Sequence, residues 1–395
     1  MPDSLTVFQP NTQNELAQFV GENASISRRT LQPIGGGTAS SETTADSVVR
    51  VYLDKLNRVI DFPARDMTIT VEAGIRMAEL ARILKAENQR LPIDVPQAEQ
   101  ATLGGVIATN WSGSRRFGCG TMRDYVIGIS AIDVSGREFK AGGRVVKNVA
   151  GYDLCKLLVG SRGTLAIIAQ VTLKLRPVLE TSALVRLTFD SLSQIDAVLN
   201  RLLTSATRPM VLDVLSGTGH PPKLVVGYEG AAREVGWQVE TLLKECQPFE
   251  PRAAESLVGA EAEDLWNTLR DFPIETSSVA TLKAGLPPSR TCELLRLANE
   301  AGIATQAHAG NGIVIGHLPN RVKTSDQAAV LLGPLSEFVR SRGGTLSMSR
   351  APSDWPRLDV AAESLAGSLA WGQRLKRQLD PHNLLNPGVM AFGSA

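Results

Sequence analysis

The chain has 395 residues, with 41 Lys and Arg against 40 Asp and Glu, a formal net charge of +1 and only four histidines. A general nucleic-acid or membrane-surface binder gains energy from clustered positive charge, and this balance supplies no such excess. The composition therefore argues against those classes and favours small-molecule chemistry.

The length fits two domains of roughly 100–200 residues each, and 43% hydrophobic residues can form a core in both. The four cysteines are scattered without a CxxC pair, which argues against a zinc site, an iron–sulfur cluster or a disulfide framework. The first residues lack a basic segment with a long apolar stretch, and no run of about 18 apolar residues follows. We expect a cytoplasmic chain that reaches the inner face of a membrane only through partner subunits.

Up to about residue 177, short β-branched runs alternate with glycine-rich loops, which indicates an α+β half. Strands are predicted at residues 48–53 and 67–71. Gly35, Gly36 and Gly37 follow a short apolar segment. Backbone amides there could surround an anion, and the alternative is a tight turn between strands.

Two further glycine-rich stretches favour anion binding over plain turns. Residues 101–110 combine a threonine cap, two glycines and an apolar continuation, as at a helix N-terminus that faces phosphate. Residues 160–168 run from two glycines into an apolar strand. No GxGxxG and no GxxxxGK[ST] occurs, so neither the Rossmann fingerprint nor the Walker loop explains these glycines.

After residue 177, apolar positions alternate between period two and period 3.6. The predicted helices cover residues 195–202, 235–243, 288–299 and 327–341. The predicted strands cover residues 183–189, 210–215, 223–228, 277–284, 303–306, 313–318 and 345–348. This alternation predicts one antiparallel sheet covered by helices on one face, in an α+β domain.

Several of these motifs, taken in order and spacing, resemble the flavin domain of the vanillyl-alcohol-oxidase family, whose FAD-binding domain is of the PCMH type. The matching stretches are PIGGGT (33–38), VEAG (71–74), TLGGVIATN (102–110), RRFGCGTMRDYV (115–126), VKNVAGYDLCKLLVGSRGTLAIIAQVTLKL (146–175) and LDPHNLLNPGVM (379–390). Within the family, the sequence looks closest to FAD-binding subunits of bacterial glycolate oxidases, and next to glycolate and D-lactate dehydrogenases.

The resemblance implies a PCMH-type FAD-binding domain of two α+β subdomains, with FAD extended between them, and a ferredoxin-like α+β cap domain with an antiparallel sheet. The implied boundaries are 1–178 for the FAD domain, 179–375 for the cap and 376–395 for a segment that returns to the FAD domain. The implied FAD-binding residues are Gly35, Gly36, Gly37, Thr38, Thr102, Leu103, Gly104, Gly105, Arg123, Asp124, Gly163, Ala166, Ile167 and Asn386. Covalent members of the family usually carry a histidine where this chain has Thr38, so non-covalent FAD is expected.

Oxidation of a 2-hydroxy acid needs a cation for the carboxylate, a base for the hydroxyl proton and a hydride acceptor. By resemblance, Arg270 in a W-x-x-x-R element and Lys283 in a K…P element are the candidate cations, although such side chains are often only solvated surface charges. His308 begins a stretch that corresponds to the H-x-G-D-G-N-x-H of catalytic relatives. There Asn311, Ile313 and Ile315 replace Asp, Asn and the second His, and the region expected to read E-H-G reads SMSRAP (347–352). We therefore expect no bound metal.

Three interpretations follow. The first is an FAD-binding subunit of a glycolate oxidase or dehydrogenase complex, which converts glycolate to glyoxylate with a sister FAD-containing catalytic subunit and an iron–sulfur subunit. The second is a self-sufficient FAD-dependent D-2-hydroxyacid (D-lactate) dehydrogenase with His308 as base. The third is a non-redox scaffold subunit that FAD stabilises. Glycolate and D-lactate differ by one methyl group, worth only about 1–3 kcal/mol in a pocket, so the sequence leaves the substrate open.

Overall fold

The computed structural model describes residues 6–38, 47–143, 153–275, 277–356 and 358–389. The chain folds into two compact units. Unit 1 comprises Met1–Ser112, Gly120–Val178 and Ser368–Ala395, and unit 2 comprises Gly113–Cys119 and Leu179–Gly367. The short segment 113–119 thus folds with unit 2 although both of its flanks belong to unit 1, and no sequence pattern indicated this.

Within the described residues, unit 1 contains a three-stranded parallel sheet and a five-stranded antiparallel sheet, with one further strand pair. The parallel sheet has the order β1 (Val7–Phe8), β3 (Val48–Tyr52), β2 (Thr30–Ile34). The antiparallel sheet has the order β4 (Val59–Asp61), β5 (Thr68–Glu72), β9 (Ile167–Lys174), β7 (Val126–Ile132), β8 (Glu138–Gly142). The strand pair joins β6 (Gln89–Arg90) and β10 (Arg176–Pro177). The strands predicted at 48–53 and 67–71 are confirmed as β3 and β5.

Two apolar cores hold unit 1 together, one on each face of β9. Ile168, Val171 and Leu173 belong to a core with four helices, whereas Ile167 and Ala169 belong to a core with the parallel sheet. The helices of the first core are α2 (Met77–Ala86), α3 (Leu103–Thr109), α5 (Met122–Tyr125) and α6 (Leu154–Leu158). The second core includes α1 (Gln13–Glu22). The predicted α+β architecture of this half is confirmed.

Unit 2 is built on one nine-stranded sheet, in which every neighbouring pair of described strands is antiparallel. Its order is β14 (Ala253–Leu257), β11 (Thr181–Thr188), β13 (His220–Gly230), β12 (Val211–Gly217), β16 (Ala304–His308), β17 (Ile313–His317), β15 (Thr281–Gly285), β18 (Thr345–Arg350), β19 (Asp359–Ala361). The predicted antiparallel sheet is thus confirmed.

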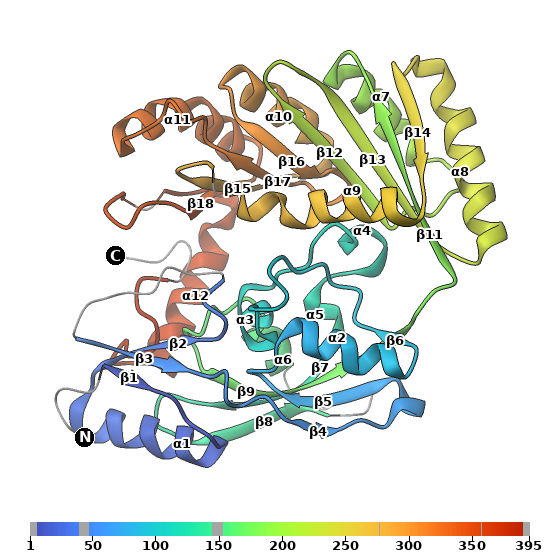
Figure 1. The fold of residues 1–395 in the computed structure, drawn as a ribbon. Helices are drawn as coiled ribbons and strands as arrows, with labels where there is room; N and C mark the ends of the chain where they lie inside the picture. Colours follow the sequence, from blue (N-terminus) through green and yellow to red (C-terminus); the bar gives the residue numbers. More distant parts are fainter. Residues whose placement is uncertain (1–5, 39–46, 144–152, 276, 357, 390–395) are drawn as a thin grey trace. The chain divides into compact units, whose positions relative to one another are not determined.

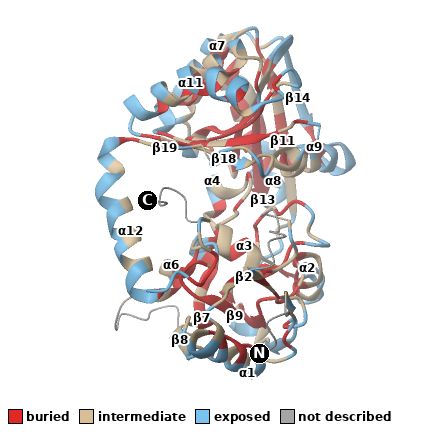
Figure 2. Cartoon of the chain, turned by 90° about the vertical axis from the view of Figure 1, so that its left-hand side faces the viewer, coloured by how far each residue is buried: buried red, intermediate tan, exposed pale blue. Residues whose placement is uncertain are grey.

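The main core of unit 2 lies between one face of this sheet and four helices. They are α7 (Leu192–Leu202), α8 (Ala232–Cys246), α10 (Thr291–Glu300) and α11 (Ser325–Ser341). α7 begins at Leu192, before the predicted range of 195–202, because Ser191 and Gln194 form a capping box. Its apolar stripe faces the sheet. Figure 2 shows the strands of this sheet largely buried and the outer side of α11 exposed.

The prediction that helices cover only one face of this sheet is wrong. Helix α9 (Gly259–Asp271) lies on the opposite face, where Leu265 and Leu269 form a second core with Val211 and Val225. Strands with apolar residues on both faces allow this, because each face can then hold its own helix layer. We call the side of the sheet that contacts this helix the α9 face.

One predicted strand of unit 2 begins later than its sequence pattern indicates. The strand predicted at 277–284 begins only at Thr281, because the Ser278 hydroxyl bonds the carbonyls of Ala280 and Leu318 and shapes a turn before it. In the part of the chain that the structure describes, no helix combines the length and apolarity needed to cross a membrane.

Candidate functional site

The loop that follows β2 packs against the N-terminus of α3 in unit 1. Thr102 caps α3, because its hydroxyl accepts a hydrogen bond from the Gly105 amide at 3.4 Å. A Cβ on Gly35 would lie 3.3 Å from Thr102 Cβ and closer still to the Thr102 hydroxyl. A side chain at position 35 would therefore displace the cap, so two of the predicted glycine-rich sites are brought together by a contact that requires glycine.

Gly36 makes a second close approach in the same loop. A Cβ there would lie 2.6 Å from the carbonyl carbon of Gln100, whose oxygen accepts a hydrogen bond from Arg76. Gly37 has a φ of +69°, in the left-handed region that favours glycine. The loop therefore presents backbone rather than side chains, a surface suited to a phosphate-containing ligand.

The third glycine-rich stretch joins the same region through the C-terminal end of α3. Gly160 donates its amide to the Ile107 carbonyl at 2.9 Å, and Arg162 donates its amide to the Ala108 carbonyl at 2.8 Å. Gly163 has a φ of +68°, and a Cβ on it would lie 3.4 Å from the ring of Pro33, just before the first glycine loop.

The C-terminal segment closes this arrangement. The Asn386 amide donates to the Leu31 carbonyl at 2.8 Å, and its side-chain nitrogen donates to the Arg162 carbonyl at 2.7 Å. Lys376, in α12 (Ala366–Leu379), donates to the Thr164 carbonyl at 2.8 Å. We use the term glycine cradle for residues 35–38, 102–105, 160–164 and 384–386.

The other predicted cofactor residues lie in or beside unit 1's core. Leu103, Ala166 and Ile167 are almost completely buried, so any contact that they make with a ligand would come from the backbone. Thr38 ends the described part of the first loop, and residues 146–152 of one quoted motif lie outside the described residues.

Asp124 has a structural role in α5. Its carboxylate accepts hydrogen bonds from the backbone and hydroxyl of Thr121 at 2.7 and 2.9 Å. Burial opposes ionisation, yet these hydrogen bonds outweigh it and hold the pKa of Asp124 below its ordinary value. Arg123, its neighbour, is exposed.

The glycine cradle fits FAD by two tests. A Cβ at Gly35 or Gly36 would clash with Thr102 or Gln100, so the loop keeps this conformation only with glycines and presents backbone, as a glycine-lined phosphate site does. In addition, Asn110 Oδ1 and Ser161 Oγ, next to the contacts between α3 and residues 160–162, are buried without a hydrogen-bond partner in the described chain. Buried polar atoms of this kind normally bind a ligand or water.

A buried polar cluster occupies the α9 face of the sheet in unit 2. Asp213 of β12 and His308 of β16 are cross-strand partners, and His308 Nδ1 lies 2.8 Å from Asp213 Oδ1. An ionised carboxylate can only accept, so Nδ1 carries a proton and Nε2 of a neutral imidazole is left as an acceptor. Such a pair can take up and release a proton at Nε2.

Both carboxylate oxygens of Asp213 take part in hydrogen bonds. Ser114 donates its hydroxyl to Asp213 Oδ2 at 2.6 Å, and Gln306 Nε2 donates to the same oxygen at 2.9 Å. Gln306 also bonds the Leu269 carbonyl of α9 at 3.0 Å. The network therefore ties the segment 113–119, two strands and α9 to one carboxylate.

The two arginines of this segment differ. Arg115 Nε donates to Glu229 at 2.7 Å, and its guanidinium lies 3.7 Å from the centre of the Trp266 ring. Arg116 is half-buried, and its Nε is buried without a hydrogen-bond partner among the described residues. Burial lowers the pKa of Arg116 from its ordinary value, and the charge of Asp213 offsets this effect in part.

The two cations predicted from the sequence have different surroundings. Arg270, near the end of α9, forms a bidentate ion pair with Asp271 at 2.9 and 2.7 Å. Lys283 lies in β15 on the α9 face and pairs across the sheet with Ile315 and Ser347. Their assignment to a substrate carboxylate stays a prediction.

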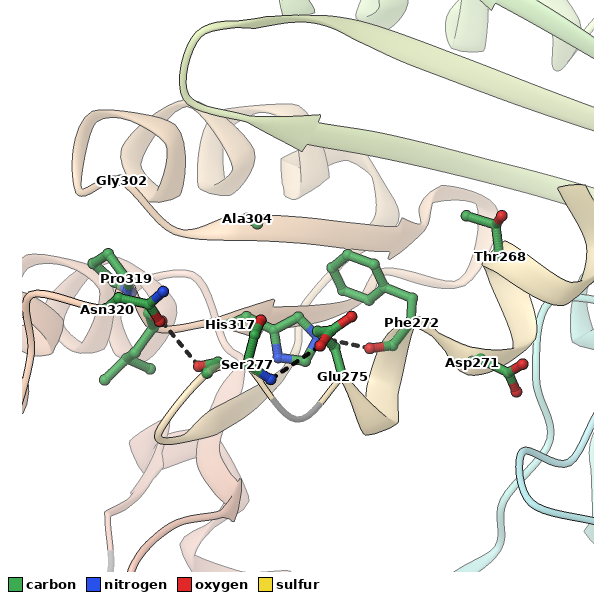
Figure 3. A pocket seen from close by; sticks show the side chains of 12 residues that line it. Thr268, Asp271, Phe272, Glu275, Ser277, Gly302, Ala304, His317, Pro319 and Asn320 are labelled. Carbon is green, nitrogen blue, oxygen red and sulfur yellow. Dashed lines mark hydrogen bonds between the residues drawn. The ribbon is translucent and has the colours of Figure 1, made fainter.

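His317 is held as a structural histidine beside a cavity of about 490 Å³ in unit 2. Its Nε2 bonds the Phe272 carbonyl at 2.6 Å, and its Nδ1 lies 3.1 Å from the Thr281 hydroxyl. Burial lowers the pKa of His317. Figure 3 shows its ring beside Phe272 and Glu275 at the wall of the cavity.

In the described residues, no three His, Cys, Asp or Glu side chains gather as a metal-ligand set. The expectation of no bound metal stays a prediction.

Sequence reasoning missed four residues of the polar cluster, namely Asp213, Gln306, Ser114 and Arg116. The available signal was an acidic residue and an amide within otherwise apolar strands, since buried charges seldom occur without a partner or a function.

Comparisons with known proteins agree with this geometry. Residues 4–142 match the FAD_binding_4 family, described as an FAD binding domain. The chain is 24% identical to glycolate oxidase subunit GlcD of Bacillus subtilis, over 99% of this chain and 89% of that protein. It is 36% identical to glycolate oxidase subunit GlcE of Escherichia coli over 120 residues, 30% of this chain and 34% of that protein. Among solved structures, an alkyldihydroxyacetonephosphate synthase superposes with a TM-score of 0.67 at 17% identity, over 97% of this chain and 75% of that one.

The glycine cradle and the matched domain together define an FAD-binding protein. Residues 4–142 match an FAD binding domain, and the chain is an FAD-dependent oxidoreductase. The cradle would hold the cofactor through residues 35–38, 102–105 and 160–164, and bound FAD would supply a two-electron acceptor.

Proposed function

We propose that this chain is the FAD-binding subunit of a complex that oxidises a small 2-hydroxy acid, glycolate, to the 2-oxo acid glyoxylate. In this proposal its FAD passes electrons to an iron–sulfur partner, and a sister flavoprotein performs most of the substrate oxidation. The single observation that carries the proposal is the combination of a complete glycine cradle in unit 1 with a reduced set of acid–base groups in unit 2. The similarity to GlcD and GlcE subunits supports the choice of glycolate.

The reduced acid–base set is visible on the α9 face. His308 is the only histidine among the described residues of that face with a carboxylate partner, because His317 bonds a backbone carbonyl and a threonine hydroxyl. Ile313 and Ile315 occupy the positions on β17 where catalytic relatives are expected to carry polar or imidazole groups. A chain with these residues can bind FAD and still depend on a partner for proton transfer from the substrate.

The FAD is proposed to be non-covalent, because Thr38 stands where covalent members of the family carry a histidine. The residues proposed to hold it are those of the glycine cradle, with Asn386 fixing the loop at Arg162. Acid precipitation of the purified chain should release the flavin into the supernatant. Flavin that stays with the precipitated protein would contradict a non-covalent site.

The test of the complex is a reconstitution. The chain is purified with the products of the neighbouring reading frames, and glycolate-dependent reduction of an artificial electron acceptor is measured with and without it. We expect activity only when this chain is present and loaded with FAD. Full activity of the partners alone would refute the proposal, as would full activity with the chain lacking FAD.

A second candidate function, a self-sufficient D-2-hydroxyacid dehydrogenase, is favoured by the Asp213–His308 pair, which could accept the hydroxyl proton at Nε2. Under this candidate, the isolated chain oxidises D-lactate with an artificial acceptor, and His308→Asn lowers kcat by about 100-fold or more. No turnover by the isolated chain would exclude it.

A further inference from the structure

Arg116 is a half-buried cation that forms no ion pair among the described residues. It lies in the segment 113–119, which folds with unit 2, and its Nε is buried without a partner in the described chain. Its neighbour Arg115 is fully engaged with Glu229 and Trp266. Arg115 therefore has a structural role, whereas the contacts of Arg116 do not account for its position.

Asp213 is the carboxylate whose charge acts on Arg116, yet both of its oxygens already accept hydrogen bonds. Oδ1 is bonded to His308, and Oδ2 is bonded to Ser114 and Gln306. Asp213 therefore lowers the electrostatic cost of placing Arg116 there but does not occupy its guanidinium. A half-buried cation with unused donors is costly unless an anion completes its hydrogen bonds.

We propose that Arg116 binds the carboxylate of a small 2-hydroxy acid, with Nε2 of His308 as the acceptor for the hydroxyl group. This assignment rests on the proposed function for its choice of ligand. A 2-hydroxy acid carries its carboxylate and its hydroxyl on adjacent carbons, so the cation and the acceptor that bind it must be neighbours. Arg116 and His308 meet this condition by two contacts. Ser114, two positions before Arg116, bonds the same Asp213 carboxylate as His308. In addition, the ring of Phe117 lies against Gly310, two positions after His308.

The charges of the site support the same ligand. Arg116 and Asp213 cancel, so a bound carboxylate leaves one negative charge beside a neutral imidazole. The substrate hydroxyl then donates a hydrogen bond to Nε2, while Nδ1 of His308 stays bonded to Asp213. Arg270 offers no equivalent arrangement, because two of its nitrogens are held by Asp271.

The experiment measures binding rather than turnover. Glycolate is titrated calorimetrically, without oxygen, into the full-length chain loaded with reduced FAD, which cannot accept a hydride. Glycolamide, the neutral amide analogue of glycolate, is the ligand control, and Arg340→Gln is the matched protein control. Arg340 lies in the same unit, on α11, and pairs only with the exposed Glu337 in the described chain.

We expect glycolate to bind the wild-type chain with a Kd of about 1 mM or below, and glycolamide not to bind. Arg116→Gln should raise the Kd about 30-fold or more, because a charge-assisted hydrogen-bonded pair is lost. Arg116→Lys should raise it about tenfold, because a point charge replaces the planar fork. Arg340→Gln should leave it within about twofold.

Three results would overturn the assignment: no glycolate binding by the wild-type chain, an unchanged Kd in Arg116→Gln, or a large loss of affinity in Arg270→Gln instead. If Arg116→Gln fails to fold, Arg116→Lys decides, and an unchanged Kd in that variant overturns the assignment. Failure of the proposed function gives a different result, because the reconstituted complex would then fail to oxidise glycolate whether or not the isolated chain binds it.

Discussion

The loop of the glycine cradle offers the sharpest test of FAD binding in unit 1, through the substitution Gly36→Ala. The added Cβ would lie 2.6 Å from the carbonyl carbon of Gln100 and 2.9 Å from Nη1 of Arg76. Carbon atoms pack at about 3.5–4.0 Å, so the loop must move by roughly 1 Å. The Gln100 carbon belongs to the backbone and cannot rotate away, and the movement must come from the loop that would hold the cofactor.

Forced overpacking of this kind costs about 1–3 kcal/mol. If the loop relaxes away from its cofactor-binding position, the same free energy appears as a loss of affinity, about 5- to 150-fold in the Kd for FAD. If the loop stays in place, the cost appears in folding. A domain of 150–250 residues would then lose roughly 2–4 °C in Tm for each kcal/mol.

The assay is fluorescence titration of FAD into the flavin-free chain, with thermal unfolding of the same samples. Gly143→Ala is the control, because Gly143 also lies in unit 1 and a Cβ on it would meet no atom of the described residues within 4 Å. We expect the control to bind FAD and unfold like the wild type. A Gly36→Ala variant with unchanged affinity and unchanged Tm would refute the argument that close backbone approach shapes this loop.

Three further predictions concern single side chains. Asp213→Ala should lower the free energy of unfolding by about 1–3 kcal/mol. It should also move the ring proton of neutral His308 away from Nδ1, which nitrogen NMR can detect. A spectrum that shows the wild-type tautomer would contradict the Asp213–His308 pair. Lys376→Met should lower the free energy of unfolding in urea by about 3 kcal/mol, because the fully buried Asp380 carboxylate loses its cation. A loss below about 0.5 kcal/mol, typical of a surface pair, would argue against a stabilising Lys376–Asp380 ion pair. Burial depresses the pKa of His317 below its ordinary 6.5, so the unfolded chain binds the proton more readily and stability should fall as the pH drops below about 6.5. This loss between pH 7.5 and 5 should shrink in His317→Gln, and an equal loss in both proteins would exclude His317 as its source.

Much of the fold could be predicted because its elements carry local signals. Thr102 followed by glycines and an apolar run predicts a capped helix, and α3 begins there. The apolar stripe at Ile195 and Val198 predicts a helix, and α7 covers both. These signals act within one or two turns of chain, so they appear in the sequence itself.

The position of α9 could not be predicted in the same way. Its apolar residues, such as Leu265 and Leu269, show that one side is buried but not which face of the sheet buries it. That choice depends on Val211 and Val225, which point to the α9 face from strands whose alternate residues serve the main core. A strand that is apolar on both faces gives no period-two signal to separate them.

The polar cluster was also beyond sequence reasoning, because it depends on contacts between distant residues. Ser114 and Asp213 are separated by 99 positions, and Asp213 and His308 by 95. His308 was identified as a candidate from its motif, but its carboxylate partner follows only from the register of β12 and β16. The role proposed for Arg116 likewise follows from the folding of the segment 113–119 with unit 2.

The most direct test of the proposed function is anaerobic mixing of the FAD-loaded, isolated chain with excess glycolate while the flavin absorbance is recorded. The account predicts no reduction of the flavin within the turnover time of the complex, and rapid reduction after the partner subunits are added. Rapid and complete reduction of the isolated chain by glycolate would contradict it, because the chain would then oxidise the substrate without a catalytic partner.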